Sequence, residues 1–76
     1  MKYLVVVRRT DTGYAAHVPD IEECVARGRT RDQVERQIRA VLEFHLTALL
    51  QAGQALPRQR VYTTHIEAIA PSALTG

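Results

Sequence analysis

Four acidic residues in the first third of this 76-residue sequence are the side chains best suited to chemistry. They are Asp11, Asp20, Glu22 and Glu23. Metal-dependent cleavage of a phosphodiester needs several carboxylates that converge on ions about 4 Å apart. Three of the four crowd one predicted loop and none interrupts the strand predicted at the N-terminus, which argues against a nuclease site. Two interpretations stay open, a solvated acidic loop and an acidic patch that faces a basic partner.

The histidines and the single cysteine indicate neither a metal site nor a nucleophile. His17, His45 and His65 fall on three separate predicted elements without the spacing of a metal motif. We predict that His45 is a buried neutral imidazole with a hydrogen-bond partner. Cys24 is predicted to be a buried small apolar residue, since the sequence indicates no general base beside it. We therefore expect no catalysis, no metal and no cofactor.

Apolar periodicity predicts the elements that carry these residues. They are strands over 2–8, 14–18 and 24–27, an acidic loop over 20–23, a helix between Thr30 and Gly53, and a final strand over 60–67. The first strand has two apolar faces, which is typical of a central strand covered on both sides. The third strand is short and carries an arginine, which suits a sheet edge.

The predicted helix is long for a chain of this size. Thr30 followed by Gln33 has the form of a capping box at its start, and Gly53 is placed to cap its end. The helix would span about 33 Å at 1.5 Å per residue. A strand after such a helix favours a right-handed crossover that runs parallel to the first strand. We therefore expect an α+β fold in the order β-β-β-α-β, with one sheet covered by one long helix.

A chain this short has a thin stability margin, so it needs stabilisation beyond its own core. Cys24 is the only cysteine and cannot form an internal disulfide. The apolar surface of the predicted helix also spreads wider than one sheet face requires, and such a surplus marks an interface. We expect a homo-oligomer, a dimer or larger, whose interface includes Tyr3, Phe44, Leu46 and Leu50.

Charge and terminal composition restrict the partners. The net charge is +2, and the basic residues are scattered with few aromatics, which is not typical of a nucleic-acid-binding chain. The apolar run near the N-terminus is too short for a signal peptide or a membrane span, and a lone thiol fits a reducing compartment. We expect a cytoplasmic protein with no membrane partner. The domain is expected over residues 1–67, with a flexible tail over 68–76.

One ordered set of residues spans nearly the whole predicted domain. It comprises Gly13-Tyr14-Ala15-Ala16-His17-Val18-Pro19-Asp20-Ile21, then Cys24, Gly28 with Thr30, His45-Leu46, and Gly53 with Pro57. This set resembles the HicB-like antitoxins of bacterial type II toxin–antitoxin systems, over about residues 1–67. The resemblance implies a partial ribonuclease H-like fold. It also implies a partner, a HicA-like toxin that cleaves messenger RNA, which the antitoxin neutralises by occluding its active site. Fold similarity does not bring nuclease activity with it.

Two departures from that family bear on the predicted function. Glu22-Glu23 stands where the family usually has Pro-Gly, which makes the loop more acidic. Many family members continue into a DNA-binding domain, whereas this sequence ends at Gly76, so we expect no DNA binding from this chain alone. A toxin that cleaves RNA must present a basic surface, and opposite charges steer association. The residues expected to bind the toxin are Pro19, Asp20, Ile21, Glu22 and Glu23.

Two other functions stay open. One is a residual metal-dependent ribonuclease of ribonuclease H-like fold, whose RNA cleavage would be lost when Asp11 or Asp20 is changed. The other is an orphan oligomeric module that binds RNA or a small ligand, and it predicts no toxin gene beside this one.

Overall fold

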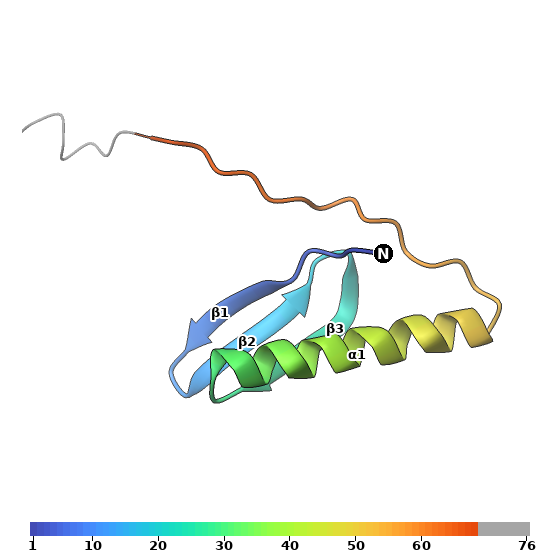
Figure 1. The fold of residues 1–76 in the computed structure, drawn as a ribbon, viewed down its shortest axis with the longest axis horizontal. Helices are drawn as coiled ribbons and strands as arrows, with labels where there is room; N and C mark the ends of the chain where they lie inside the picture. Colours follow the sequence, from blue (N-terminus) through green and yellow to red (C-terminus); the bar gives the residue numbers. More distant parts are fainter. Residues whose placement is uncertain (69–76) are drawn as a thin grey trace, which may run out of the picture.

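A computed structural model describes residues 1–68 and contains one sheet and one helix. The elements are β1 (Val6–Thr10), β2 (Gly13–Val18), β3 (Ile21–Gly28) and α1 (Arg31–Gln51). The strands form an antiparallel sheet in the order β1-β2-β3. Helix α1 covers one face of this sheet and packs mainly against β3 and β2 (Figure 1). The predicted α+β class, with one sheet and one long helix, is confirmed.

Glycine permits two close backbone approaches at one end of the domain. Gly13 follows the β1–β2 turn with a φ of 155°, and a Cβ there would lie 2.3 Å from the carbonyl oxygen of Gly28. A Cβ on Gly28 would in turn lie 2.9 Å from the backbone nitrogen of Val34 in α1. The hairpin turn, the end of β3 and the start of α1 therefore meet closely because neither glycine carries a side chain.

The predicted start of the helix at Thr30 is confirmed, whereas its C-cap is Ala52, one residue before the predicted Gly53. Thr30 is the N-cap, and its Oγ1 accepts the backbone N–H of Gln33 at 3.1 Å. The Gln33 side chain reaches back, and its Oε1 accepts the N–H of Arg29 at 2.8 Å. After the last turn Gly53 has a φ of 72° and donates its N–H to the carbonyl of Leu50 at 3.0 Å. Local side-chain and backbone chemistry thus satisfies groups that both helix ends would otherwise leave unpaired.

The core lies between α1 and the sheet. Its buried members are Ala16, Val18, Ile21, Cys24, Val34 and Ile38. Tyr3, Val5 and Val7 pack against this cluster, so they share the face that alternation predicts for them. The Tyr3 hydroxyl donates to the carbonyl of Pro57, which ties the start of the chain to the segment after α1.

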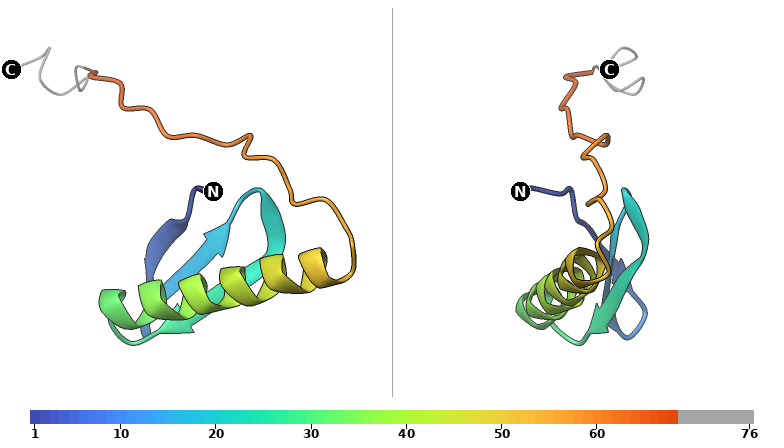
Figure 2. Two further views of the ribbon diagram at one scale, coloured as in Figure 1. Left: turned by 45° about the vertical axis from the view of Figure 1, so that its right-hand side comes forward. Right: turned by 90° about the vertical axis from the view of Figure 1, so that its right-hand side faces the viewer.

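The predicted final strand is wrong. Residues 60–67, which we call the C-terminal arm, form no ladder and run extended away from the sheet (Figures 1 and 2). β1 is consequently an edge strand and not the central strand that its two apolar faces predicted. The alternation specifies extended backbone, but a ladder also needs a neighbouring strand, which the pattern does not identify. The N–H groups of Arg60 and Val61 instead bond the Asp20 carboxylate at 3.1 and 3.3 Å.

Two further findings concern predictions about the ends of the chain. The predicted flexible tail over 68–76 lies outside the described residues except for Ala68, which is exposed. In the part of the chain that the structure describes, no helix has the length and apolar character needed to cross a membrane.

Candidate functional site

An irregularity in the pairing of β2 with β3 displays the acidic residues. Val18 pairs with Ile21, and His17 pairs with Val25. One step along β2 therefore corresponds to four steps along β3, so residues 22–24 of β3 have no counterpart on β2. A bulge of this kind bends its strand and redirects side chains, often beside a functional site. The predicted acidic loop is therefore corrected to a bulged strand that begins at Ile21.

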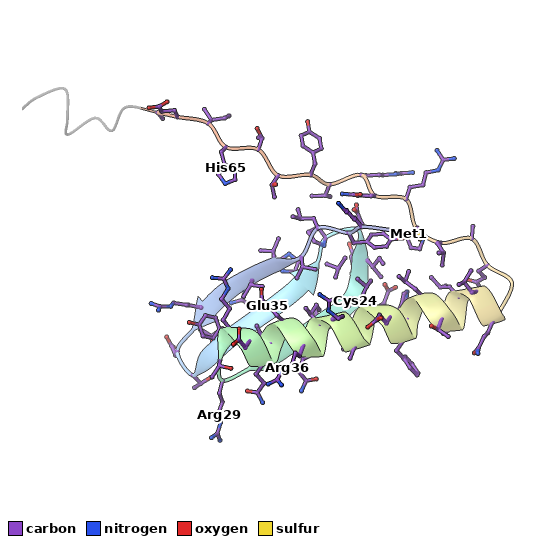
Figure 3. The ribbon with its side chains drawn as sticks, in the orientation of Figure 1. Met1, Cys24, Arg29, Glu35, Arg36 and His65 are labelled. Atoms are coloured by element: carbon purple, nitrogen blue, oxygen red, sulfur yellow. The ribbon has the colours of Figure 1, made fainter. Side chains whose placement is uncertain are left out.

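The bulge separates two chemically different groups. Cys24 is fully buried between the sheet and α1 (Figure 3), which confirms its prediction as a buried apolar residue. Burial raises the pKa of the Cys24 thiol, and the neighbouring Glu23 carboxylate raises this pKa further. A thiol that stays neutral and inaccessible is a poor nucleophile. Glu22 and Glu23 are exposed to solvent, so the bulge presents only carboxylates outward.

A shallow groove of about 500 Å³ joins this bulge to the far end of α1. We call it the acidic groove. One side is formed by the consecutive residues 19–23, which are the five residues expected to bind a toxin. The other side is formed by His45 and Leu49 of α1 and by residues 54–57 after the helix, except Leu56. The sequence gives no local signal for this second side, because it depends on how α1 crosses the sheet.

The electrostatics of the acidic groove favour a cationic partner. Glu22 and Glu23 are exposed, while Asp20 is half-buried and holds the start of the C-terminal arm through its carboxylate. The C-terminal end of α1 borders the groove through Leu49, and the last turn of the helix contains no basic residue. A helix C-terminus carries about half a negative charge. The carboxylates and the helix end therefore attract positive charge to the same surface.

His45 is the residue of the groove that the prediction placed incorrectly. It was expected to be a buried imidazole, but it is only partly buried, and no polar or charged side chain is fully buried among residues 1–68. The reason is that α1 extends past the sheet at this end (Figures 1 and 2). A position on the apolar stripe can therefore face a groove instead of the core.

The residues expected at an oligomer interface divide into two pairs. Tyr3 and Leu46 are partly buried and pack against the core of their own domain. Phe44 is 78% exposed and Leu50 is 61% exposed, both on the half of α1 that borders the acidic groove. The apolar surface that α1 leaves for a partner is therefore carried by Phe44 and Leu50.

The other candidate groups lie far from one another. Asp11 lies in the β1–β2 turn, at the opposite end of the sheet from the acidic groove. His17 is exposed on β2, and His65 lies on the C-terminal arm, away from the sheet (Figure 3). Within residues 1–68, no three His, Cys, Asp or Glu side chains are arranged to hold a metal ion. The structure thus brings together residues 19–23 and His45, but not the four carboxylates that a nuclease site would need.

Comparison with known proteins finds a similarity to a phage protein. The chain is 24% identical over 66 residues to an uncharacterized 14.9 kDa protein in the rep-hol intergenic region of Haemophilus phage HP1. The match covers 87% of this chain and 50% of the phage protein, so the chain spans about half the length of this relative. No family model matches the chain. No solved structure matches it.

Proposed function

We propose that the chain is a HicB-like antitoxin, which binds a small basic ribonuclease of the HicA-like type and covers its active site. The observation that supports this most is the acidic groove, which combines residues 19–23 with the end of α1 in one accessible surface. The bulge in β3 directs Glu22 and Glu23 outward while its backbone stays anchored by the buried Cys24. The protein would act by binding and not by catalysis, in the cytoplasm, and as a homo-oligomer.

The shape of the acidic groove suits a protein surface better than a small molecule. Small-molecule sites are concave and bury most of their ligand, whereas this groove is shallow and open. Pro19, Leu49 and Pro57 supply apolar contact area, and the carboxylates lie beside them. Protein interfaces combine an apolar centre with a polar rim in this way. We assign the three strands and α1 to the partial ribonuclease H-like fold that the resemblance implies.

Charge reversal in the acidic groove tests this proposal. The proposed function predicts that a small basic protein is encoded beside this chain, and the association of that protein with the full chain is measured by stopped-flow at several salt concentrations. Glu22→Lys with Glu23→Lys should lower the association rate by about tenfold or more at low salt and flatten its salt dependence. Asp11→Lys is the matched control, because it changes an exposed carboxylate at the opposite end of the sheet. Equal rates for both variants and the unmodified chain would reject the acidic groove as the binding surface.

The enzymatic alternative has its own readout. Purified full chain is incubated with RNA and magnesium or manganese, and the products are separated on a gel. We expect intact RNA. Cleavage that disappears in Asp20→Asn but persists in Asp32→Asn, an exposed carboxylate on α1, would instead favour the residual ribonuclease.

A further inference from the structure

The outer edge of β1 has no partner strand. β1 pairs only with β2, so one row of its backbone N–H and C=O groups is unpaired by the described residues. Such an edge can template pairing with another chain, and natural proteins usually cover or blunt it. α1 does not cover this edge, because it lies mainly over β3 and β2, and the charged side chains of β1 are confined to Arg8 and Arg9, which leaves the segment before them unprotected.

A second observation at the same edge is an unfilled apolar groove between β1 and α1, of about 450 Å³. Tyr3, Val5 and Val7 line it from the β1 side, and Ile38 and Leu42 line it from the helix. Three charged residues complete its lining, Lys2, Glu35 and Arg39. The three apolar residues on the β1 side and Leu42 remain only partly buried, although they face the core. The apolar layer between sheet and helix is therefore incomplete on the β1 side, where a further strand would complete it.

The C-terminal arm has the composition of such a strand. Its residues 61–64 are β-branched or aromatic without exception, and these types are enriched in strands. Tyr62 and Ile66 share one face of the extended arm and are 79% and 83% exposed. At about 3.3 Å per residue, the eight residues of the arm span about 26 Å. This length matches residues 3–10, which contain β1 and the segment that leads into it.

We propose that the C-terminal arm of one copy pairs with the open edge of β1 in a second copy, and that Tyr62 and Ile66 fill the groove between β1 and α1 of that copy. The direction of the arm favours a second copy over its own domain. Asp20 holds the start of the arm beside the β2–β3 turn, and the arm then leaves its own sheet (Figures 1 and 2). Reciprocal exchange of one identical element closes a two-fold dimer.

This exchange rests on the homo-oligomer of the proposed function and specifies its interface, but it is independent of the proposed toxin binding. It uses the β1 edge and the arm, whereas the acidic groove uses the β3 bulge and the far end of α1. A dimer that does not bind a toxin would reject the proposed toxin binding and leave the strand exchange intact. A monomer that binds a toxin would reject the strand exchange and leave the toxin binding intact.

The test uses the full chain and measures its mass in solution by light scattering. The unmodified chain should have a mass of about 17 kDa, twice that of the 8.5 kDa chain. The double variant Tyr62→Ser with Ile66→Ser should be a monomer. The matched control, Thr63→Ser with His65→Ser, changes the opposite face of the arm and should remain a dimer. Hydrogen exchange at residues 61–67 should be at least tenfold slower in the dimer than in the monomeric variant.

Two other results of the light-scattering measurement would overturn the strand exchange. A dimer that persists in the Tyr62 and Ile66 double variant would overturn the exchange and point to another surface, such as that of Phe44 and Leu50. A monomeric unmodified chain would also overturn the proposed strand exchange. This holds whether hydrogen exchange at the arm is fast or is slowed by contact with its own domain. If the double variant unfolds while the control does not, the mass of the unmodified chain decides: a dimer supports the exchange, and a monomer overturns it.

Discussion

At the scale of the residue, Asp20 links the two surfaces of the molecule. Its carboxylate lines the acidic groove, and the same carboxylate accepts the N–H groups that begin the C-terminal arm. The sequence predicts the exposure and charge of this region. It cannot predict the contact with Arg60, which lies 40 residues further along the chain. Asp20 is therefore a positioning residue for the arm, and it also lies on the surface that we propose as the toxin-binding site.

Cys24 gives the protein a pH dependence at alkaline pH. The pKa of its thiol is raised above the ordinary value of 9.0 by burial and by Glu23, so the folded state binds the proton more tightly than the unfolded state. Its stabilising effect is complete below about pH 9 and is lost as pH rises through the folded pKa. Cys24→Ala should cost about 1 kcal/mol at pH 7, and this difference should shrink as pH rises from 8 to 11. Stability is measured by calorimetric unfolding across this pH range. A difference between the unmodified chain and Cys24→Ala that stays constant with pH would contradict a raised pKa of the Cys24 thiol.

Gly13 should tolerate no side chain. Gly13→Ala would place a Cβ 2.3 Å from a backbone oxygen that no rotamer change can move, and we expect a loss of about 2 kcal/mol or more in the free energy of unfolding. Gly53→Ala is the control, since its Cβ would meet nothing within 4 Å and only its φ of 72° is strained. We expect a loss of about 1 kcal/mol there. Urea unfolding measures the free energy of unfolding of the two variants. An equal loss in both would contradict the close approach of Gly13 to the backbone of Gly28.

At the scale of the element, local signals predicted more than long-range ones. The cap at Thr30, the end of the helix near Gly53 and the end of β2 at Pro19 were predictable, because each depends on residues within a few positions. The bulge in β3 was not predictable, since it depends on register against β2. The C-terminal arm was predicted as a strand for a sound local reason. It does not pair with the open edge of β1 in its own domain, because Asp20 holds its start beside the β2–β3 turn and the arm leaves the sheet from there.

Thr30 should contribute measurably to the stability of α1. Thr30→Ala removes the side-chain acceptor for the N–H of Gln33 and should cost about 1 kcal/mol in the free energy of unfolding. Thr47→Ala replaces an exposed threonine inside the same helix and should change stability by less than about 0.5 kcal/mol. Thermal unfolding followed by circular dichroism compares them. Equal stability of the two variants would show that the cap contributes nothing.

At the scale of the whole molecule, charge is distributed unevenly despite a net value of only +2. Arg29 and Arg31 flank the start of α1, whereas Glu22 and Glu23 border its other end. The exposed Glu22 and Glu23 and the C-terminal end of α1, whose last turn has no basic residue, form a negative surface at that end, while Arg58 and Arg60 are exposed on the segment that follows. A partner that is steered by charge would therefore approach one end of the domain. The open edge of β1 stays available for a second copy.

The proposed antitoxin function requires that the acidic groove silence a ribonuclease. The most direct test is RNA cleavage by the small basic protein that we expect to be encoded beside this chain, measured while the full chain is added in increasing amounts. We expect cleavage to stop when the two proteins are equimolar, and to continue when Glu22→Lys with Glu23→Lys is added instead. Asp11→Lys should inhibit as well as the unmodified chain does. Undiminished cleavage at a several-fold excess of the unmodified chain would contradict the antitoxin function.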